Sequence, residues 1–566
     1  MAIDEPVRTM ADRAPGPAVR TALVIGLALL ASCGSGGGGD SPSPAPAPPP
    51  ALAPAPLPPP SAPLRVSPAS TFAPGCNGAQ AGILYVNAEV EPSVAVNPLN
   101  PNNVVGSWQQ DRWSSGGSQG IVVANSFDGG ATWATRPLPF SRCAGGSASN
   151  GGDFDRASDP WTTFAIDGSA YQLALTFTGT TFAAGSQTAL LVSRSNNGGA
   201  TWGAATTLIR DGAGFFNDKG SITADPRDAR FVYATWDRLV AAGGGPTMLV
   251  RSIDNGLTWS VPVAIYDPGV MSQTVGNVIV MLPDGTLVDL FTQIDFATNG
   301  AQTATLAVIR SSDRGLTWSR PIKVADLLAV GTRDPQTGAI VRDAAILGEI
   351  AADPAGNLVV VWQDARFSGG MRDAISNSRS TDGGLSWSAP RAINGATGAA
   401  AFVPVVAARA DGVIGVIYYD FRDDTADATT LLTDLWLARS ADAGATWIEA
   451  RLAGPFDLTI APLTEGGYFL GDYQALTATA SRFVTLFATT NATPPDLVNR
   501  TDIYTAPAAL LAREAEARVL PHAAEVTPAK LTPALRQQAS DALLQALRSR
   551  WPGWRRPEGR SGAAQP

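Results

Sequence analysis

The sequence predicts an all-β fold built from repeated four-stranded units, and three observations support this prediction. An eight-residue motif occurs six times, as SFDGGATW, SNNGGATW, SIDNGLTW, SSDRGLTW, STDGGLSW and SADAGATW. Each copy follows two short apolar runs separated by a turn, such as WTTFAI, IDG and YQLALTF. The 58 glycines and 44 prolines among 566 residues favour turns over helices. Short strands that repeat in this way are typical of a β-propeller with four-stranded antiparallel blades.

A seventh unit, without the motif, follows the sixth copy. Residues 468–491 and 501–506 supply three strands, and we expect GILYVN (82–87) to supply the fourth. A strand from the other end of the domain would close the ring and protect its edges. We therefore predict a seven-bladed propeller over residues 80–507, with six blades as the alternative.

The repeated motif has the composition of a structural turn. Gly at its fifth position tolerates the positive φ of a tight turn, and Asp at its third can accept hydrogen bonds from turn amides. The second copy has Asn in place of this Asp, which a turn tolerates and a catalytic acid does not. We expect the closing Trp to be buried between sheets. The motif is therefore predicted to build the fold, not the active site.

The first residues indicate export. Arg13 and Arg20 precede the apolar run TALVIGLALL, which is too short to span a membrane as a mature helix. The run ends in LASC, which resembles the lipobox of bacterial lipoproteins and implies lipidation at Cys33. The alternative is an ordinary signal peptide with a chance Cys. We predict a lipoprotein signal over residues 1–33, a Gly/Pro-rich linker over 34–65, and a protein lipid-anchored to the bacterial cell envelope, at the outer membrane.

Composition excludes several kinds of chemistry. The formal charge of −9 argues against nucleic acid as the main partner. The single histidine, His522, lies outside the repeats, so Ser-His-Asp, Cys-His and histidine-ligated zinc sites are not expected in the body. Once Cys33 is lipidated, Cys76 and Cys143 remain as a pair in an oxidising compartment, and we expect a disulfide between them. No cofactor is predicted, and no loop has the spacing of a calcium site.

The motif S-x-D-x-G-x-T-W resembles the Asp-box, or BNR repeat, of the sialidase superfamily. The resemblance implies a box on the turn between the third and fourth strands of a blade, and sites on the opposite face. Sialidases use an arginine triad, a Tyr nucleophile with a Glu partner, and an Asp acid/base.

Several residues of this chain match that pattern. Tyr473, in DYQAL, resembles the nucleophile, Glu349 resembles its partner, and Asp111 lies nearest to the place of the acid. Second strands end in Asp–Arg patterns, which implies a substrate-binding rim of Arg112, Trp113, Arg238, Arg366 and Arg422, although such pairs could equally join neighbouring blades. First strands open near carboxylates at Glu91, Asp159, Asp218 (followed by Lys219), Glu349 and Asp472. Stacking candidates are Trp113, Trp161, Trp236 and Tyr418.

The first blade departs from the family. It opens with Glu91-Pro92-Ser93 where sialidases have Arg-Ile-Pro, and its loop WSSGGSQG holds no acid. A carboxylate at that place disfavours a sialic-acid carboxylate. From the residues that do match the family, we predict a surface-anchored, sialidase-like, exo-acting glycoside hydrolase. The alternatives are a non-catalytic carbohydrate- or protein-binding propeller and a purely structural lipoprotein. The expected partner is a glycan or glycoprotein, and we expect a monomer.

The tail over residues 508–566 is basic and predicted to contain a short helix. Thr532-Pro533 has the pattern of a helix start, with Thr as the cap and Pro at the first position. Apolar residues then recur at helical spacing until WPGWRRPEGR. We expect this helix to pack on the propeller.

Overall fold

The computed structural model describes residues 62–343, 345–396, 398–491, 500–507, 518–519, 532–551 and 553–557. The predicted signal segment with Cys33, most of the predicted linker, and His522 lie outside these residues. Within the described part, no helix combines the length and apolar character needed to cross a membrane.

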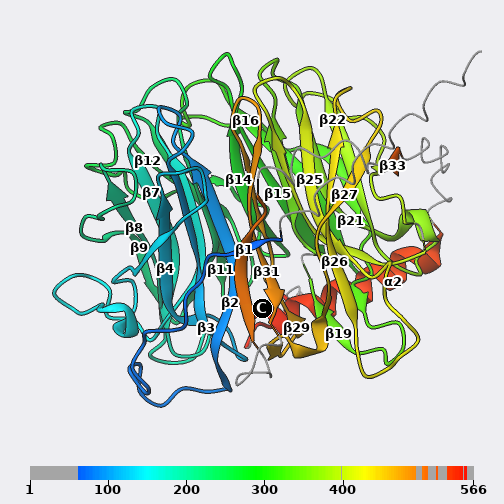
Figure 1. Ribbon diagram of the computed structural model, residues 1–566, viewed down its shortest axis with the longest axis horizontal. Coiled ribbons are helices and arrows are strands. Elements are labelled where there is room, and N and C mark those ends of the chain that lie inside the picture. The colour runs from blue at the N-terminus through cyan, green and yellow to red at the C-terminus, as the bar shows by residue number, and fades with distance from the viewer. Residues whose placement is uncertain are drawn as a thin grey trace, which may run out of the picture. The chain divides into compact units, whose positions relative to one another are not determined.

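Strands dominate the fold, in successive antiparallel groups of four, as predicted (Figure 1). The first three groups are β2 (Leu84–Val96), β3 (Val104–Trp113), β4 (Ser118–Ser126) and β5 (Ala134–Pro137); β6 (Arg156–Phe164), β7 (Ala170–Thr178), β8 (Gln187–Ser195) and β9 (Thr206–Gly212); and β10 (Phe215–Ala224), β11 (Val232–Val240), β12 (Thr247–Ser252) and β13 (Val263–Tyr266).

The next three groups repeat this order. They are β14 (Ser272–Met281), β15 (Leu287–Phe296), β16 (Gln302–Ser311) and β17 (Ile322–Leu327); β20 (Gly348–Ala352), β21 (Leu358–Asp364), β22 (Ala374–Ser380) and β23 (Arg391–Ala392); and β24 (Ala401–Ala408), β25 (Ile414–Asp420), β26 (Leu432–Ser440) and β27 (Ile448–Asp457), which β33 (Arg518–Val519) extends.

The last group joins the two ends of the domain. β30 (Ala475–Ala478), β31 (Phe483–Thr490) and β32 (Thr501–Thr505) pair in order, and β1 (Leu64–Arg65) pairs with β32 as the outer strand. The prediction that residues 82–87 form this outer strand is wrong: Leu84 and Tyr85 belong to β2 and pair with β3. The strand that takes this place is only the two residues Leu64–Arg65, too short to show an apolar pattern in the sequence.

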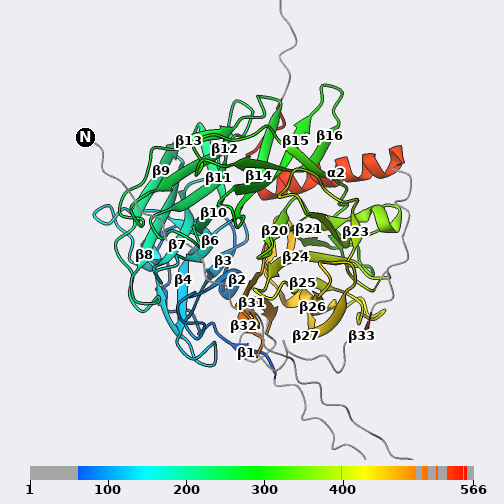
Figure 2. The ribbon, with the colours of Figure 1, turned by 90° about the horizontal axis from the view of Figure 1, so that it is seen from above.

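The first strands of successive groups lie side by side around a common centre (Figure 2). β2 contacts β6, and contacts continue through β10, β14, β20, β24 and β30, which contacts β2 again. Trp108, Trp236 and Trp362, each on a second strand, are fully buried in the packing between groups. Each group thereby covers the apolar faces of its neighbours.

Each motif copy forms the turn between a third and a fourth strand, as the resemblance implies. In the fourth group, Asp313 accepts from Thr317 N at 2.9 Å, Thr317 Oγ1 at 2.6 Å and Ser311 Oγ at 2.8 Å. Asn197 makes the equivalent contacts with Thr201 and Ser195 in the second copy. The motif is thus a self-contained turn in which carboxylate and amide are interchangeable.

The motif tryptophans are less buried than predicted. Only Trp447 is fully buried, and the other five are half-buried against the edges of the apolar core. The ring folds back on its own turn, where Trp133 Nε1 donates to Gly130 O at 3.0 Å. Because the motif lies at the tip of a hairpin, one face of the indole has no neighbouring sheet to pack against.

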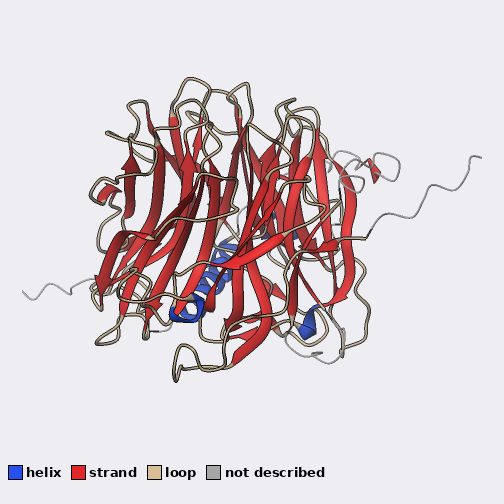
Figure 3. Ribbon diagram, turned by 60° about the vertical axis from the view of Figure 1, so that its left-hand side comes forward, coloured by secondary structure: helices blue, strands red, loops and turns tan. Residues whose placement is uncertain are grey.

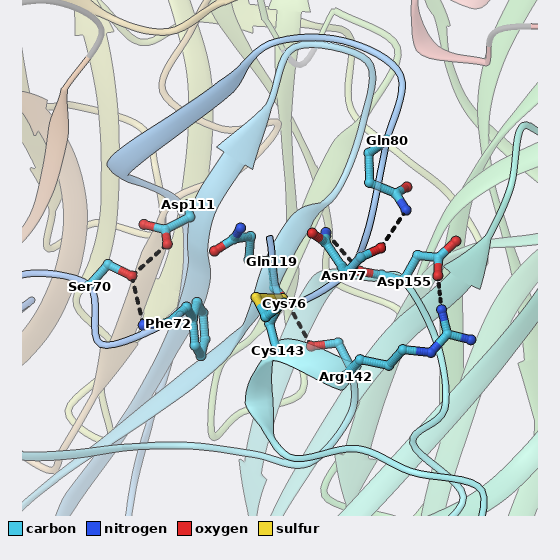
Figure 4. The surroundings of a disulfide bond; sticks show 11 residues. Ser70, Phe72, Cys76, Asn77, Gln80, Asp111, Gln119, Arg142, Cys143 and Asp155 are labelled. Carbon is cyan, nitrogen blue, oxygen red and sulfur yellow. Dashed lines mark hydrogen bonds and ion pairs between the residues drawn. A yellow bond between two sulfur atoms is a disulfide. The ribbon is translucent and has the colours of Figure 1, made fainter. Parts of the chain in front are cut away.

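The segment before β2 is fastened by a disulfide between Cys76 and Cys143, the pair named from the sequence (Figure 4). Asn77 Nδ2 donates to Asp155 O at 3.2 Å, and Arg142 pairs with Asp155 beside the disulfide. The bond closes a loop of 67 residues and ties this segment to the first two groups.

Two elements lie outside the repeats. A small sheet combines β18 (Thr332–Arg333) and β19 (Ile340–Arg342) with β28 (Leu463–Thr464) and β29 (Gly467–Phe469). Helix α2 (Pro533–Arg550) is capped by Thr532, whose Oγ1 accepts from Leu535 N at 3.2 Å. Figure 3 shows this helix lying across the lower ends of the strands. It buries Leu535, Ala539, Leu543 and Leu547, one residue per turn.

Candidate functional site

Five of the first strands carry a β-bulge at the same place. Their registers shift between Val90 and Ser93, Ser158 and Trp161, Asp218 and Ser221, Val275 and Val278, and Phe402 and Val405. Each bulge holds one left-handed residue, which is Glu91 (φ 54°), Asp159 (φ 49°), Lys219 (φ 48°), Gly276 (φ 74°) and Val403 (φ 52°). A non-glycine residue in this region costs about 1–3 kcal/mol, and such strain concentrates at functional sites.

The bulges gather ionisable groups into one cluster. We call it the first-strand cluster; its members are Glu91, Asp159, Asp218, Lys219, Glu349, Asp472 and Tyr473. Glu349 lies on β20, and the last two residues lie just before β30. Asp159, Lys219, Glu349, Tyr473 and the half-buried Trp161 line one small pocket of about 20 Å³. The structure therefore brings together the charged first-strand residues singled out from the sequence.

Two neighbouring acids of the cluster have opposite pKa shifts. Burial, and then the charge of Asp159, raise the pKa of Glu91 to about 8. Burial also acts to raise the pKa of Asp159, but Lys219 and Arg550 outweigh it and leave that pKa below its ordinary value. Their carboxyl groups are hydrogen-bonded to each other. At neutral pH, Glu91 therefore holds a proton beside an ionised Asp159.

Glu349 lines the pocket with a carboxyl group that is not held by a polar partner among the described residues. Burial raises its pKa to about 7, against a smaller lowering by Lys219. Within the described residues, no hydrogen bond or ion pair engages its carboxyl group. The buried Lys219 Nζ likewise has no hydrogen-bond partner in the described part of the chain. A carboxyl group that is half-protonated near neutral pH can both give and take a proton.

Tyr473 lies in the pocket but is not poised as a nucleophile. Its hydroxyl donates to Pro160 O at 3.1 Å, and its ring lies 5.5 Å from that of Trp161. Lys219 Nζ is 3.8 Å from the ring centroid. Burial, followed by the charge of Glu91, raises the pKa of Tyr473 well above its ordinary value. In this arrangement Tyr473 is a neutral hydrogen-bond donor that supports Lys219.

Arginines converge beside Asp472. Arg342, from the small sheet, contacts Asp472 through Nε at 3.2 Å and Nη2 at 2.8 Å. Arg342 and Arg112 both lie over the ring of Phe469, at 4.6 and 4.8 Å. Arg342 and Arg550, followed by Lys219, overcome the effect of burial and hold the pKa of Asp472 well below its usual range. Of the predicted rim arginines, only Arg112 lies beside the cluster.

The other predicted rim arginines are engaged elsewhere. Arg238 pairs with Asp211 at 2.7 Å, Arg366 with Asp364 at 2.7 Å, and Arg422 with Asp420 at 2.6 Å and Glu449 at 2.9 Å. Only the Arg238–Asp211 pair joins two groups, the second and the third, as the alternative from the sequence proposed; the pairs of Arg366 and Arg422 lie within one group each.

Asp111 and most of the stacking candidates also have structural contacts. Ser70 Oγ donates to Asp111 (Figure 4). The Asn87 amide also donates to Asp111, at 2.8 Å. Trp113 is buried under Arg156, whose guanidinium lies 4.8 Å from the ring. Trp236 and Tyr418 are fully buried. Among the stacking candidates, Trp161 alone lines the pocket.

Sequence reasoning missed Arg342, Phe469, Arg550 and Trp551. Arg342 and Phe469 lie outside the repeats, and the other two belong to the tail, so no periodic pattern marks them. Within the described residues, no group of three His, Cys, Asp or Glu has a geometry that could hold a metal ion.

No protein-family model matches the chain. No curated protein matches it either. Solved structures similar to it include the Hadza microbial sialidase Hz136, at 16% identity over 71% of this chain and 73% of that one, with a TM-score of 0.41. A PL25 ulvan lyase matches at 11% identity over 76% and 96%, with a TM-score of 0.46. The arabinofuranosidase Arb93A of Fusarium graminearum matches at 11% identity over 63% and 92%, with a TM-score of 0.42.

Proposed function

We propose that the seven strand groups are the blades of one β-propeller, and that the first-strand cluster is the active site of an exo-acting glycoside hydrolase. The contacts of the first strands, which return from β30 to β2, support the closed ring. The observation that carries the function is one pocket in which Glu349 has a raised pKa and Asp159 a lowered one on either side of Lys219. Two carboxyl groups whose pKa values are pushed apart define an acid and a base.

Glycosidic cleavage needs a proton for the leaving oxygen and a base for the attacking water. Glu349 supplies the proton, because it is still protonated near neutral pH and has no competing partner among the described residues. Asp159, kept ionised by Lys219, takes the proton of a water that attacks the anomeric carbon. Trp161 offers a half-exposed indole face for the sugar ring. This assignment gives Tyr473 a positioning role, in contrast to the Tyr-nucleophile mechanism of the resembled family.

Two variants separate the mechanisms. Fluorogenic glycosides, sialosides included, are incubated with wild-type protein, Glu349→Gln and Tyr473→Phe, with Asp382→Asn in a motif turn as the control. We expect Glu349→Gln to lose hydrolysis while Tyr473→Phe keeps part of it. Loss in Tyr473→Phe together with a trapped tyrosyl-sugar adduct in wild type would instead establish the nucleophile role.

A non-catalytic glycan-binding propeller is the second candidate. It is favoured by the fully paired Arg238, Arg366 and Arg422 and by the small volume of the pocket. Glycan-array binding that persists in Glu349→Gln, without hydrolysis of any bound glycan by wild type, would support it.

We further propose that the propeller acts at the cell envelope, tethered by a lipid on Cys33 through the Gly/Pro-rich linker. The support is the LASC sequence after an apolar run. Metabolic labelling with an alkyne fatty acid is expected to mark the wild-type chain and not Cys33→Ala. Equal labelling of both would overturn the tether.

A further inference from the structure

The end of helix α2 reaches into the first-strand cluster. Arg550 Nη1 lies 2.7 Å from Asp472 Oδ2, and its Nε lies 3.4 Å from Asp218 Oδ2. Trp551 Nε1 donates to the same Asp218 oxygen at 2.6 Å. The side chain of Arg550 is only 7% exposed, and Trp551 is 2% exposed. One guanidinium thus bridges β10 and the segment before β30, which belong to groups far apart in the chain.

The chain after the helix continues across the same end of the strands. Trp554 packs on Phe296, with centroids 5.6 Å apart, and its Nε1 donates to Gln273 Oε1 at 3.2 Å. Arg556 then donates to Ala297 O. Arg550, Trp551, Trp554 and Arg556 therefore contact the third group, the fourth group and the segment just before β30.

The helix does not fit its seat closely. A cavity of about 420 Å³ lies between α2 and the strands beneath it. Thr332 Oγ1 and Gln302 Oε1, both buried and both in residues of its lining, lack hydrogen-bond partners among the described residues. Protein interiors are normally packed as densely as organic crystals, with few voids larger than a water molecule. A helix seated over such a space is held mainly by its anchoring contacts.

The groups under the segment are incompletely satisfied while it is docked. Lys219 Nζ and Asp237 Oδ2 are buried without a hydrogen-bond partner in the described part of the chain. Buried polar groups are nearly always paired with protein or with water, so these two groups need an explanation. Arg550 therefore occupies the cluster without completing its hydrogen bonding.

We propose that residues 533–551 and 553–557 form an intramolecular plug, docked against the first-strand cluster through Arg550 and Trp551, which must withdraw before a ligand reaches the cluster. The plug occupies a subsite for a cation, formed by Asp218 and Asp472. The docking itself is independent of the hydrolase proposal. Only its effect on turnover rests on that proposed function.

Lysine acylation tests the plug without any substrate. Lys219 is buried and follows Asp218, which Arg550 and Trp551 contact, and Lys323 is an internal reference whose side chain is 57% exposed. The full-length chain is treated with an acylating reagent, and the ratio of Lys219 to Lys323 modification is read by mass spectrometry. We expect Arg550→Ala to raise this ratio about tenfold or more, because a buried charged contact is lost. The exposed Arg548 on the same helix provides the matched control, Arg548→Ala, with no change expected.

A second pair of measurements guards against misfolding. Trp551→Phe keeps an aromatic six-membered ring but loses the indole N–H that binds Asp218 and some buried volume, so it should give an intermediate ratio with at most a small drop in melting temperature. A synthetic peptide of residues 545–557 should restore protection of Lys219 in the Arg550→Ala protein. Wild-type ratios in a folded Arg550→Ala, Trp551→Ala double variant would overturn the plug. If the ratio rises and no glycoside is cleaved, the plug stands and the hydrolase proposal fails.

Discussion

The motif turns and the first-strand cluster are both rich in carboxylates, yet their chemistry is opposite. The aspartates of the turns lie at hairpin tips, and hydrogen bonds, those of Thr132 first, lower the pKa of Asp128 to about 2. In the cluster, burial raises the pKa of Glu91 to about 8 and that of Glu349 to about 7, whereas Asp159 and Asp472 keep lowered pKa values only because cationic side chains face them. Local turn amides stabilise the charge at one end of the strands, and loss of water destabilises it at the other.

The two regions also differ in how they repeat. The turns share one side-chain motif, and in the second copy Asn197 replaces Asp while still accepting from the Thr201 amide. The bulges repeat only in backbone, and their five left-handed positions hold Glu91, Asp159, Lys219, Gly276 and Val403. Repetition of side chains therefore marks architecture, and variation on a repeated backbone marks the candidate site.

The largest expected effect is on turnover. Glu349→Gln removes the proposed proton donor while keeping the side chain's shape, and it should lower kcat/KM about 100-fold or more. The turn variant Asp442→Asn should stay within about twofold, because it lies far from the pocket lining. Initial rates with a fluorogenic substrate measure both. Equal losses of kcat/KM in the two variants would contradict the assignment of catalysis to the first-strand cluster and of structure to the motif turns.

The next largest effect is on stability at raised pH. Unfolded Glu91 loses its proton near 4.5, whereas folded Glu91 keeps it to about 8. Its contribution to stability is therefore fully present below pH 4.5 and is lost as pH rises to about 8. Glu91→Gln should be more stable than wild type by about 2–4 kcal/mol at pH 8 and nearly equal at pH 5. Chemical denaturation at both pH values measures the two free energies of unfolding. If their difference is no larger at pH 8 than at pH 5, the raised pKa of Glu91 is contradicted.

A smaller effect on stability, at acid pH and not at raised pH, is expected for a motif turn. Despite some burial, hydrogen bonds led by Thr446 lower the folded pKa of Asp442 to about 2. This contribution is present above the unfolded pKa of about 3.9 and is lost as pH falls toward 2. Asp442→Asn should therefore flatten the acid side of the stability profile, by less than about 1 kcal/mol because the group is mostly exposed. Melting temperatures between pH 2.5 and 5 provide the measurement. If the variant loses as much stability as wild type over this range, the lowered pKa of Asp442 is contradicted.

The smallest effect is expected for Asn197→Asp, which makes the second turn like the others. Both side chains accept from Thr201 N, so stability at pH 7 should change by no more than about 0.5 kcal/mol. The variant should gain the acid sensitivity of the other turns. A large loss at pH 7 would show that Asn197 has a role beyond its turn.

Much of the fold was predictable because its signals are local. The turn motif and the alternating runs located the strands of the six motif-bearing groups, and Thr532-Pro533 located the start of α2. The outer strand of the last group was misplaced because Leu64–Arg65 is only two residues long and lies in a Pro-rich stretch. No local pattern distinguishes such a strand from linker.

The site was predictable only in part. Glu91, Asp159, Lys219, Glu349 and Asp472 were found because they open first strands, which a propeller brings together. Which arginines face them was not predictable, since Arg366 and Arg422 resemble Arg112 in sequence but pair with their own neighbours. Arg342 and Arg550 come from an insertion and from the tail.

The sequence alone determined the repeating units, their turns and the charged residues that open the first strands, because these depend on interactions within about a dozen residues. Only the tertiary structure decided which charges meet, which acids retain a proton, and that Arg550 reaches Asp218 and Asp472. These outcomes depend on burial and on contacts between segments up to several hundred residues apart, and Coulomb energies inside a protein change steeply with such distances. They cannot be deduced from the pattern of residues along the chain.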